Sequence, residues 1–176
     1  MISICIPVYN GSQFIEECID SILKQTFTDF ELLISNDCSI DNTLEIIKKY
    51  TDKRIKIFSN DTNVGWVKNC NILLSKTKGF YYCIIPCDDL IPENYIESLY
   101  NKIIKDDTII NCYPYICAFG LININISQKS ISNNSVTLRI KDFILNHFNG
   151  ISFRGLVKKT NDPELLYLSE NLKDDM

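Results

Sequence analysis

The sequence predicts a three-layer α/β domain, in which helices cover both faces of a mostly parallel sheet. Short apolar runs alternate with helical patterns through about the first hundred residues, and this alternation is typical of parallel strands joined by crossover helices. The chain has 176 residues, of which 45% are hydrophobic and 23% are charged. This length and composition suit one globular domain and exclude a disordered or coiled-coil protein.

Four strands and four helices are expected in this part of the chain. The strands are expected where apolar residues run together, at 2–8, 30–34, 55–58 and 80–85. In the first helix, Phe14, Cys18 and Ile22 recur every four residues and place apolar side chains on one stripe. Further helices are expected at 41–50, at 67–76 and from Pro92 onward.

Residues 107–176 follow a different pattern, and we take them as a shorter second half of the domain that begins with 1–106. Strands are expected at 108–117, 121–127 and 151–157, with a helix at 139–147. The stretch from Thr108 to Gln128 contains no charged residue. Asn123 and Asn125 alternate with isoleucines there, which favours strands over a membrane-spanning helix.

The charge and the cysteines argue against a nucleic-acid-binding protein, a disulfide framework and a zinc site. The chain has 18 basic and 22 acidic residues, a net charge of −4, which argues against a nucleic-acid-binding protein. The N-terminus lacks the basic region of a signal peptide, so the eight cysteines are expected to be core residues without disulfides. The pairs Cys83/Cys87 and Cys112/Cys117 are spaced more loosely than zinc-ribbon ligands, and we do not expect a structural zinc.

The carboxyl ends of the predicted strands carry the residues with the clearest chemistry, since ligands of parallel sheets bind at that edge. The adjacent Asp88 and Asp89 follow the fourth strand, and their mutual repulsion favours a bound divalent cation. The alternative is a solvated pair that caps the next helix. Asp37 follows the second strand, where it is placed to accept hydrogen bonds from a ribose or base, or to start a turn with Ser39.

Other enzyme classes lack their sequence signatures. No GxGxxG or GxxxxGK[ST] loop is present, which argues against a dinucleotide-dependent dehydrogenase and a P-loop kinase. His147 is the only histidine, and no GxSxG motif accompanies it, which argues against a Ser-His-Asp hydrolase. Taken by themselves, Asp174 and Asp175 read as an ordinary acidic tail.

Six segments stand out in order along the chain. They are 4–10 (ICIPVYN), 20–26 (DSILKQT), 35–43 (SNDCSIDNT), 63–71 (NVGWVKNCN), 79–81 (GFY) and 88–92 (DDLIP). They resemble, in the same order, the motifs IIPVYN, DSILNQT, VDDGSTDNT, the N-x-G helix, GEY and DD-x-x-P of family-2 glycosyltransferases of the GT-A fold. Each motif is weak alone, but the ordered set is specific. The resemblance implies a GT-A-like, Rossmann-like domain that moves a sugar from a nucleoside-diphosphate sugar, commonly a UDP-sugar, to an acceptor hydroxyl, usually with inversion.

The resemblance also implies roles for particular residues. Pro7 and Tyr9 would line the nucleotide pocket, and Asp37 would hydrogen-bond the base. Asn10, Asn36 and Asn71 are assigned to the same donor site. Asp88 and Asp89 would face the ribose, the diphosphate and a manganese or magnesium ion, with Asp89 as the more direct metal ligand.

The acceptor side rests on the last residues. Residues 170–176 (ENLKDDM) resemble the family's ENLKYEDM, which implies that Asp175, next to Asp174, is the base that deprotonates the acceptor. The implied acceptor is a glycan or a lipid-linked glycan in surface polysaccharide or glycan synthesis. The implied location is the cytoplasm, with peripheral attachment to the inner membrane face as an alternative.

Several departures from the family pattern support other interpretations. Asn36 replaces an aspartate, Cys38 replaces a glycine, and Cys70 stands where many members have arginine. The chain ends one residue after Asp175, so we expect this residue to be held weakly. One alternative is therefore a weak or inactive relative that only binds a nucleotide-sugar. Another is a nucleotidyltransferase, which the lack of basic residues in 7–12 opposes.

Overall fold

A computed structural model describes residues 1–105, 111–112 and 155–159 of the chain. The sheet has six strands in the order β3-β2-β1-β4-β6-β5. In sequence order the strands are β1 (Ile2–Val8), β2 (Phe30–Asn36), β3 (Ile55–Ser59), β4 (Tyr81–Ile84), β5 (Asn111–Cys112) and β6 (Leu156–Lys158). The first four run parallel to one another, and β6 lies antiparallel between β4 and β5.

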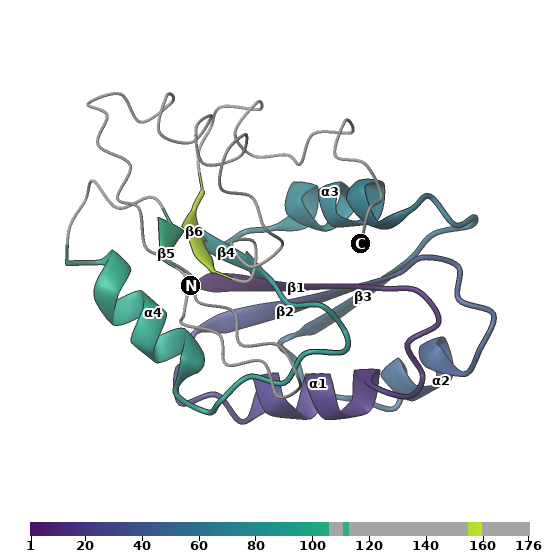
Figure 1. Cartoon of the computed structure of the whole chain (residues 1–176), viewed down its shortest axis with the longest axis horizontal. Coiled ribbons are helices and arrows are strands. Elements are labelled where there is room, and N and C mark those ends of the chain that lie inside the picture. Colours follow the sequence, from purple (N-terminus) through teal and green to yellow (C-terminus); the bar gives the residue numbers. More distant parts are fainter. Residues whose placement is uncertain (106–110, 113–154, 160–176) are drawn as a thin grey trace, which may run out of the picture.

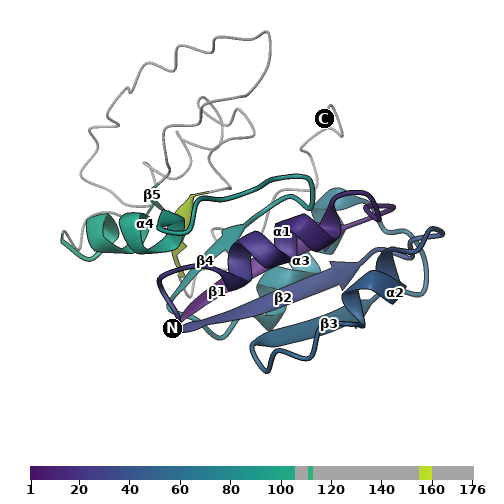
Figure 2. The same cartoon turned by 90° about the horizontal axis from the view of Figure 1, so that it is seen from below.

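Helices cover both faces of this sheet. They are α1 (Ile15–Leu23), α2 (Thr43–Ile47), α3 (Trp66–Lys76) and α4 (Tyr95–Ile103). Helix α3 lies alone on one side, and the other three lie on the opposite side (Figure 1). The view from below shows α1 and α2 across the strands β1 to β3 (Figure 2). The predicted three-layer α/β arrangement with a mostly parallel sheet is therefore confirmed.

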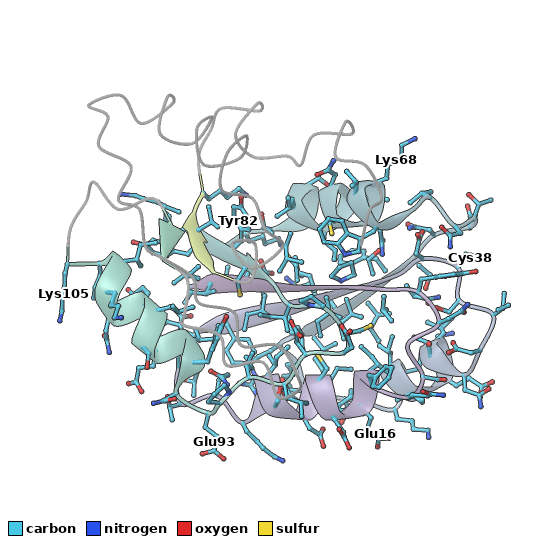
Figure 3. The ribbon with its side chains drawn as sticks, in the orientation of Figure 1. Glu16, Cys38, Lys68, Tyr82, Glu93 and Lys105 are labelled. Atoms are coloured by element: carbon cyan, nitrogen blue, oxygen red, sulfur yellow. The ribbon has the colours of Figure 1, made fainter. Side chains whose placement is uncertain are left out.

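A hydrophobic core lies on each side of the sheet. Every residue of β1 and β2 is buried, as expected for strands that are covered on both faces. Because side chains alternate along a strand, Ile4 and Ile6 pack toward α1, whereas Cys5 packs with Leu73 under α3. At the surface, Glu16 and Lys68 point away from the sheet on opposite sides (Figure 3).

The predicted strands and helices of the first hundred residues are present, with differences in length. Strand β4, for example, covers Tyr81–Ile84 where 80–85 was expected. Strand β2 runs two residues farther than expected, to Asn36. Helix α2 is shorter than the expected 41–50, because the Asp41 carboxylate accepts the N–H of Thr43 and delays the helix start. At its other end, the N–H groups of Lys49 and Tyr50 bond three residues back, which tightens the last turn.

The expected elements after residue 105 fall only partly within the described residues. Strand β5 lies within the predicted range 108–117. Strand β6 overlaps the predicted range 151–157 and ends one residue beyond it, at Lys158. The strand expected at 121–127 and the helix expected at 139–147 lie outside the described residues, and the division into 1–106 and 107–176 stays a prediction. No helix in the described part of the chain is long and apolar enough to cross a membrane.

The cysteines support the core interpretation where they are described. Cys5, Cys18, Cys70 and Cys83 are buried and free of disulfides. Burial is the main reason why the pKa of the Cys5 thiol lies well above its ordinary value, so this thiol stays protonated and packs as a small apolar side chain.

Gly79 marks a close approach between the turn before β4 and the start of β1. A Cβ atom at this position would lie 2.7 Å from the backbone N of Ser3 and 2.8 Å from the carbonyl O of Tyr81. Because backbone atoms cannot rotate away, we expect Gly79→Ala to lower the free energy of unfolding by about 2 kcal/mol. The control is Lys78→Ala, at an exposed side chain, with an expected change below about 0.5 kcal/mol. Equal denaturation midpoints for the two variants would contradict this packing.

Candidate functional site

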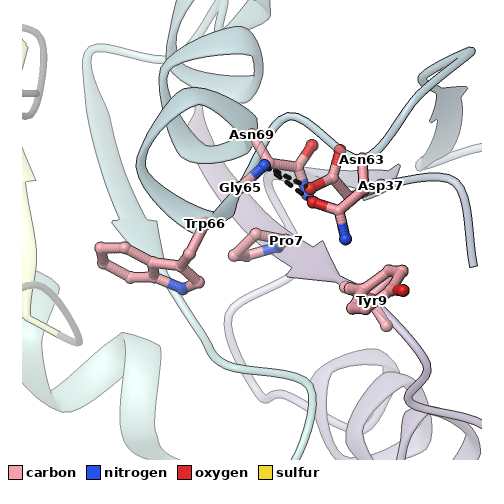
Figure 4. A pocket seen from close by; sticks show the side chains of 8 residues that line it. Pro7, Tyr9, Asp37, Asn63, Gly65, Trp66 and Asn69 are labelled. Atoms are coloured by element: carbon pink, nitrogen blue, oxygen red, sulfur yellow. Dashed lines mark hydrogen bonds between the residues drawn. The ribbon is translucent and has the colours of Figure 1, made fainter. Parts of the chain in front are cut away.

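A pocket of about 240 Å³ lies at the carboxyl ends of β1 and β2, where the parallel-sheet rule places ligands. Its lining consists of Pro7, Val8, Tyr9, Asp37, Asn63, Gly65, Trp66 and Asn69. Figure 4 shows the Pro7 ring between the rings of Trp66 and Tyr9, with Asp37 and Asn63 close to one another. The volume is below the 300 Å³ or so of a typical small-molecule site, which suits one ring system of a larger ligand. The sequence-predicted residues Pro7, Tyr9 and Asp37 are thus brought together in one pocket.

Asp37 is the buried charge of this pocket, with only 2% of its surface exposed. Its Oδ1 accepts hydrogen bonds from Asn60 Nδ2 at 2.7 Å and from the Val64 backbone N–H at 2.9 Å. Its Oδ2 accepts the Gly65 N–H at 2.9 Å. All three donors belong to the segment that connects β3 to α3, so the carboxylate fixes that segment against the end of β2.

The sequence left open that Asp37 starts a turn with Ser39, but in the structure Asn36 makes this turn. Asn36 Oδ1 accepts the backbone N–H of Ser39 at 3.3 Å. The side chain of Asn36 is buried and serves this turn, and Asn36 is not among the residues that line the pocket.

Asn69, which lines the pocket, and Asn60, which donates a hydrogen bond to Asp37, were not singled out from the sequence. Asn69 is 1% exposed, and its Nδ2 donates to the Ser35 carbonyl at 3.0 Å. Asn69 Oδ1 accepts the second hydrogen of Asn60 Nδ2 at 3.1 Å. The available signal was a polar residue among the buried positions of α3, next to Val67 and Cys70.

The loops after β1 and β2 are joined to one another by side-chain hydrogen bonds. Asn10 donates its backbone N–H to Ser39 Oγ, and its Oδ1 accepts the Ile40 N–H, both at 2.9 Å. Asn10 therefore fixes the loops and does not line the pocket. Asp41 Oδ2 accepts the N–H of Ser12 at 3.1 Å. Burial opposes ionisation of Asp41, but the hydrogen bonds from Thr43 and Ser12 outweigh it and lower its pKa to about 2.

Cys38 stands at the position where the family motif has glycine, and its backbone explains that preference. Its φ is 59°, in the left-handed region, which residues other than glycine and asparagine rarely adopt. The side chain contacts the Asp61 carbonyl through Sγ at 3.5 Å. The loop thus keeps a glycine-type conformation although the residue is a cysteine.

Asp88 and Asp89 follow β4, which lies next to β1 and ends at the same edge of the sheet. The two residues lie in a turn, in which the Asp89 backbone N–H donates to the Pro86 carbonyl at 3.1 Å. The preceding residue, Cys87, lies beside the β1 loop, because a Cβ atom on Gly11 would be 3.0 Å from Cys87 Sγ. Burial and then the Asp88 carboxylate raise the pKa of Cys87 to about 11, as expected next to negative charge.

The chemistry of this pair fits a hard divalent cation. Manganese and magnesium prefer carboxylate oxygens and complete their coordination with water and phosphate oxygens, so two carboxylates are a sufficient protein contribution. Within the described ranges no group of three or more His, Cys, Asp or Glu side chains lies close enough to hold a metal alone.

The remaining candidates divide into described and undescribed positions. Asn71 is a half-buried residue of α3 that does not line the pocket. Cys70, at the place of the family arginine, is fully buried in the core under α3 and presents no group to a ligand. Asp174 and Asp175 lie outside the described residues.

Comparison with known sequences gives a consistent result. The model of the family "Glycosyl transferase family 2" matches residues 3–161. Glycosyltransferase GlyG of Streptococcus pneumoniae is 33% identical over 120 residues, which cover 65% of this chain and 40% of GlyG. Chondroitin synthase of Pasteurella multocida is 37% identical over 115 residues, which cover 64% of this chain and 12% of that protein. The chain thus spans less than half the length of these relatives.

Solved structures share the fold. TarS 1–349 of S. aureus in complex with UDP-GlcNAc has a TM-score of 0.57 and 31% identity, over 59% of this chain and 31% of that one. The mannosyltransferase PcManGT from Pyrobaculum calidifontis, in complex with GDP-Man and Mn2+, has a TM-score of 0.59 at 20% identity, over 62% of this chain and 34% of that one. The fold, the motifs and the match to the family model agree, and the chain belongs to glycosyltransferase family 2.

Proposed function

We propose that this chain binds a UDP-sugar as its nucleoside-diphosphate sugar donor. It transfers the sugar to an acceptor hydroxyl with inversion at the anomeric carbon. One observation carries the proposal: the buried Asp37 carboxylate lines a ring-sized pocket at the sheet edge where Asp88 and Asp89 also lie. Membership of the family and the 31% identical TarS structure with UDP-GlcNAc support it.

In this proposal each group of residues has its own part. Pro7 and Tyr9 hold the base, since the half-exposed Tyr9 ring and the Pro7 ring offer apolar surface at the pocket. Asp37 accepts a hydrogen bond from the base. Asp88 and Asp89 hold the manganese or magnesium ion, which neutralises charge on the diphosphate as it leaves. Asn10 and Asn36 act indirectly, by fixing the loops that carry Tyr9 and Asp37.

We further propose that the acceptor is a glycan or a lipid-linked glycan. Relatives named chondroitin synthase and hyaluronan synthase support this class of acceptor. A location in the cytoplasm or at the inner membrane face stays a prediction.

The proposed base, Asp175, can be tested separately from donor binding. Because a base acts on the acceptor and not on the nucleotide, Asp175→Asn is expected to reduce sugar transfer by about 100-fold or more, with UDP affinity unchanged. Transfer is measured as UDP release from UDP-GlcNAc with Mn²⁺ and a glycan acceptor. Asp174→Asn is the matched control, with a much smaller expected loss. Equal rates for both variants and the parent chain would contradict this assignment, and donor binding without UDP release by the parent chain would contradict transfer itself.

A further inference from the structure

We propose that Asn60 and Asn69 are positioning residues that set the base preference of the pocket through Asp37. They hold the carboxylate so that a single acceptor position remains open, which selects uracil over guanine. This inference rests on the proposed nucleotide-sugar function and deepens it. The fold alone does not determine which base is bound, since proteins of similar fold have been solved in complex with UDP-GlcNAc and with GDP-Man.

Asn69 is the fixed end of the arrangement. It is buried on α3, and its Nδ2 donates to the carbonyl of Ser35 in the central strand β2. This bond defines which side of the carboxamide faces Asn60, and Asn69 Oδ1 accepts one hydrogen of Asn60 Nδ2 at 3.1 Å. The orientation of Asn60 is therefore set by the sheet and not by solvent.

Asn60 connects Asn69 to the Asp37 carboxylate. Its Nδ2 has two hydrogens, and the second is donated to Asp37 Oδ1 at 2.7 Å. Its backbone N–H bonds the Asn36 carbonyl at 2.9 Å, so the residue is held at both its main chain and its side chain. Oδ1 also accepts the Val64 N–H, and two donors fill the two lone pairs of this oxygen.

The other oxygen keeps an acceptor position. Asp37 Oδ2 accepts the Gly65 N–H at 2.9 Å, and that hydrogen is shared with Asn63 Oδ1 at 3.0 Å. Gly65 provides this N–H from a left-handed conformation with φ of 86°, at the start of α3. Counted over the described residues, Oδ2 can therefore accept one further hydrogen bond from a ligand in the pocket.

One open acceptor distinguishes the two bases by their hydrogen-bonding edges. Uracil presents a single N–H between two carbonyl oxygens, which one carboxylate oxygen can satisfy. Guanine presents a ring N–H beside an amino group, and these parallel donors need both oxygens of a carboxylate, as arginine does. With Oδ1 already filled, the guanine amino group would lose its partner, and an unpaired buried donor weakens binding.

The test is the ratio of UDP to GDP affinity, measured by calorimetry on the full chain with Mn²⁺. The wild type is expected to prefer UDP. Asn60→Ala opens Oδ1 and is expected to lower the UDP:GDP preference about tenfold, the equivalent of one hydrogen bond to a charged group. Asn69→Ala, which releases Asn60, is expected to change the ratio in the same direction. A general loss of structure would weaken both nucleotides and leave the ratio unchanged.

Gln25→Ala is the matched control. Gln25 is also a buried carboxamide, which bridges Pro92 and Ile96 on the opposite side of the sheet. It is expected to lower stability without changing the ratio. Asn60 is only half-buried, and Asn60→Ser provides a second variant that keeps the backbone bond to Asn36.

The outcomes separate this inference from the proposed function. An unchanged ratio in folded Asn60→Ala and Asn60→Ser overturns the role of Asn60 and Asn69 and leaves donor binding intact. A wild type that prefers GDP overturns this inference and the choice of a UDP-sugar in the proposed function, while binding of a nucleoside diphosphate stands. A wild type that binds neither nucleotide overturns the proposed function itself, and this inference with it.

Discussion

Asp37→Ala is expected to weaken UDP binding by about 100-fold and to lower the stability of the fold at the same time. The substitution removes the acceptor for the base and takes away the carboxylate that accepts from Asn60, Val64 and Gly65, of which Gly65 keeps its shared bond to Asn63 Oδ1. A hydrogen bond to a charged group contributes about 1.5–3 kcal/mol, which corresponds to roughly tenfold to 100-fold in affinity. The loss of the loop geometry adds to this effect. Calorimetry with UDP and thermal unfolding measure the two consequences.

Asp52→Ala is the control for this prediction. Asp52 also accepts a backbone N–H, from Arg54 at 2.8 Å, and pairs with its guanidinium, but it precedes β3 and lies at the opposite edge of the sheet. It is expected to leave UDP binding unchanged. If Asp37→Ala bound UDP as tightly as Asp52→Ala, the base would not contact this carboxylate.

Glu31→Gln is expected to lower the free energy of unfolding by about 2 kcal/mol at neutral pH. Glu31 is 3% exposed, and Lys56 Nζ donates to its Oε2 at 2.6 Å. Ser3 Oγ and the Lys78 N–H both donate to Oε1 at 2.7 Å. A neutral amide keeps the shape but loses the ion pair and places an NH2 group against existing donors, which costs more than an exposed pair does.

The pH dependence gives this prediction a second test. Burial raises the pKa of Glu31, but the hydrogen bonds from Lys56, Ser3 and Lys78 outweigh it and lower the pKa overall. The ionised carboxylate therefore stabilises the fold fully above the ordinary glutamate pKa of about 4.3, and this contribution is lost as the pH falls through the lower folded value. The difference between wild type and Glu31→Gln should shrink below about pH 4, as measured by urea denaturation. A difference that grows on acidification would contradict the assignment.

The sheet could be predicted from the sequence because its central strands are buried on both faces. Such strands read as runs of mostly apolar residues, as in 2–8 and 30–34, and the helices between them show one apolar stripe. Asp37 could be placed at the site because residues that follow parallel strands share one edge. The same reasoning puts Asp88 and Asp89 after β4 at this edge of the sheet, although they are not among the residues that line the pocket.

Partnerships between distant side chains could not be predicted in the same way. Asn60 and Asn69 lie at the end of β3 and on α3, and their contact depends on how α3 packs against β2. Glu31 was not singled out from the sequence, and its pairing with Lys56 follows from the register of β2 and β3. The left-handed backbone of Cys38 was visible only through the glycine of the family motif.

Metal-assisted donor binding is tested by a calorimetric titration of the full chain with UDP, with and without manganese, beside Asp89→Ala. We expect UDP to bind in the presence of manganese, and the variant to lose this metal-dependent binding because a ligand of the ion is missing. Metal-assisted donor binding would be contradicted if wild type bound no nucleoside diphosphate, or if neither manganese nor the Asp89→Ala substitution changed the UDP affinity.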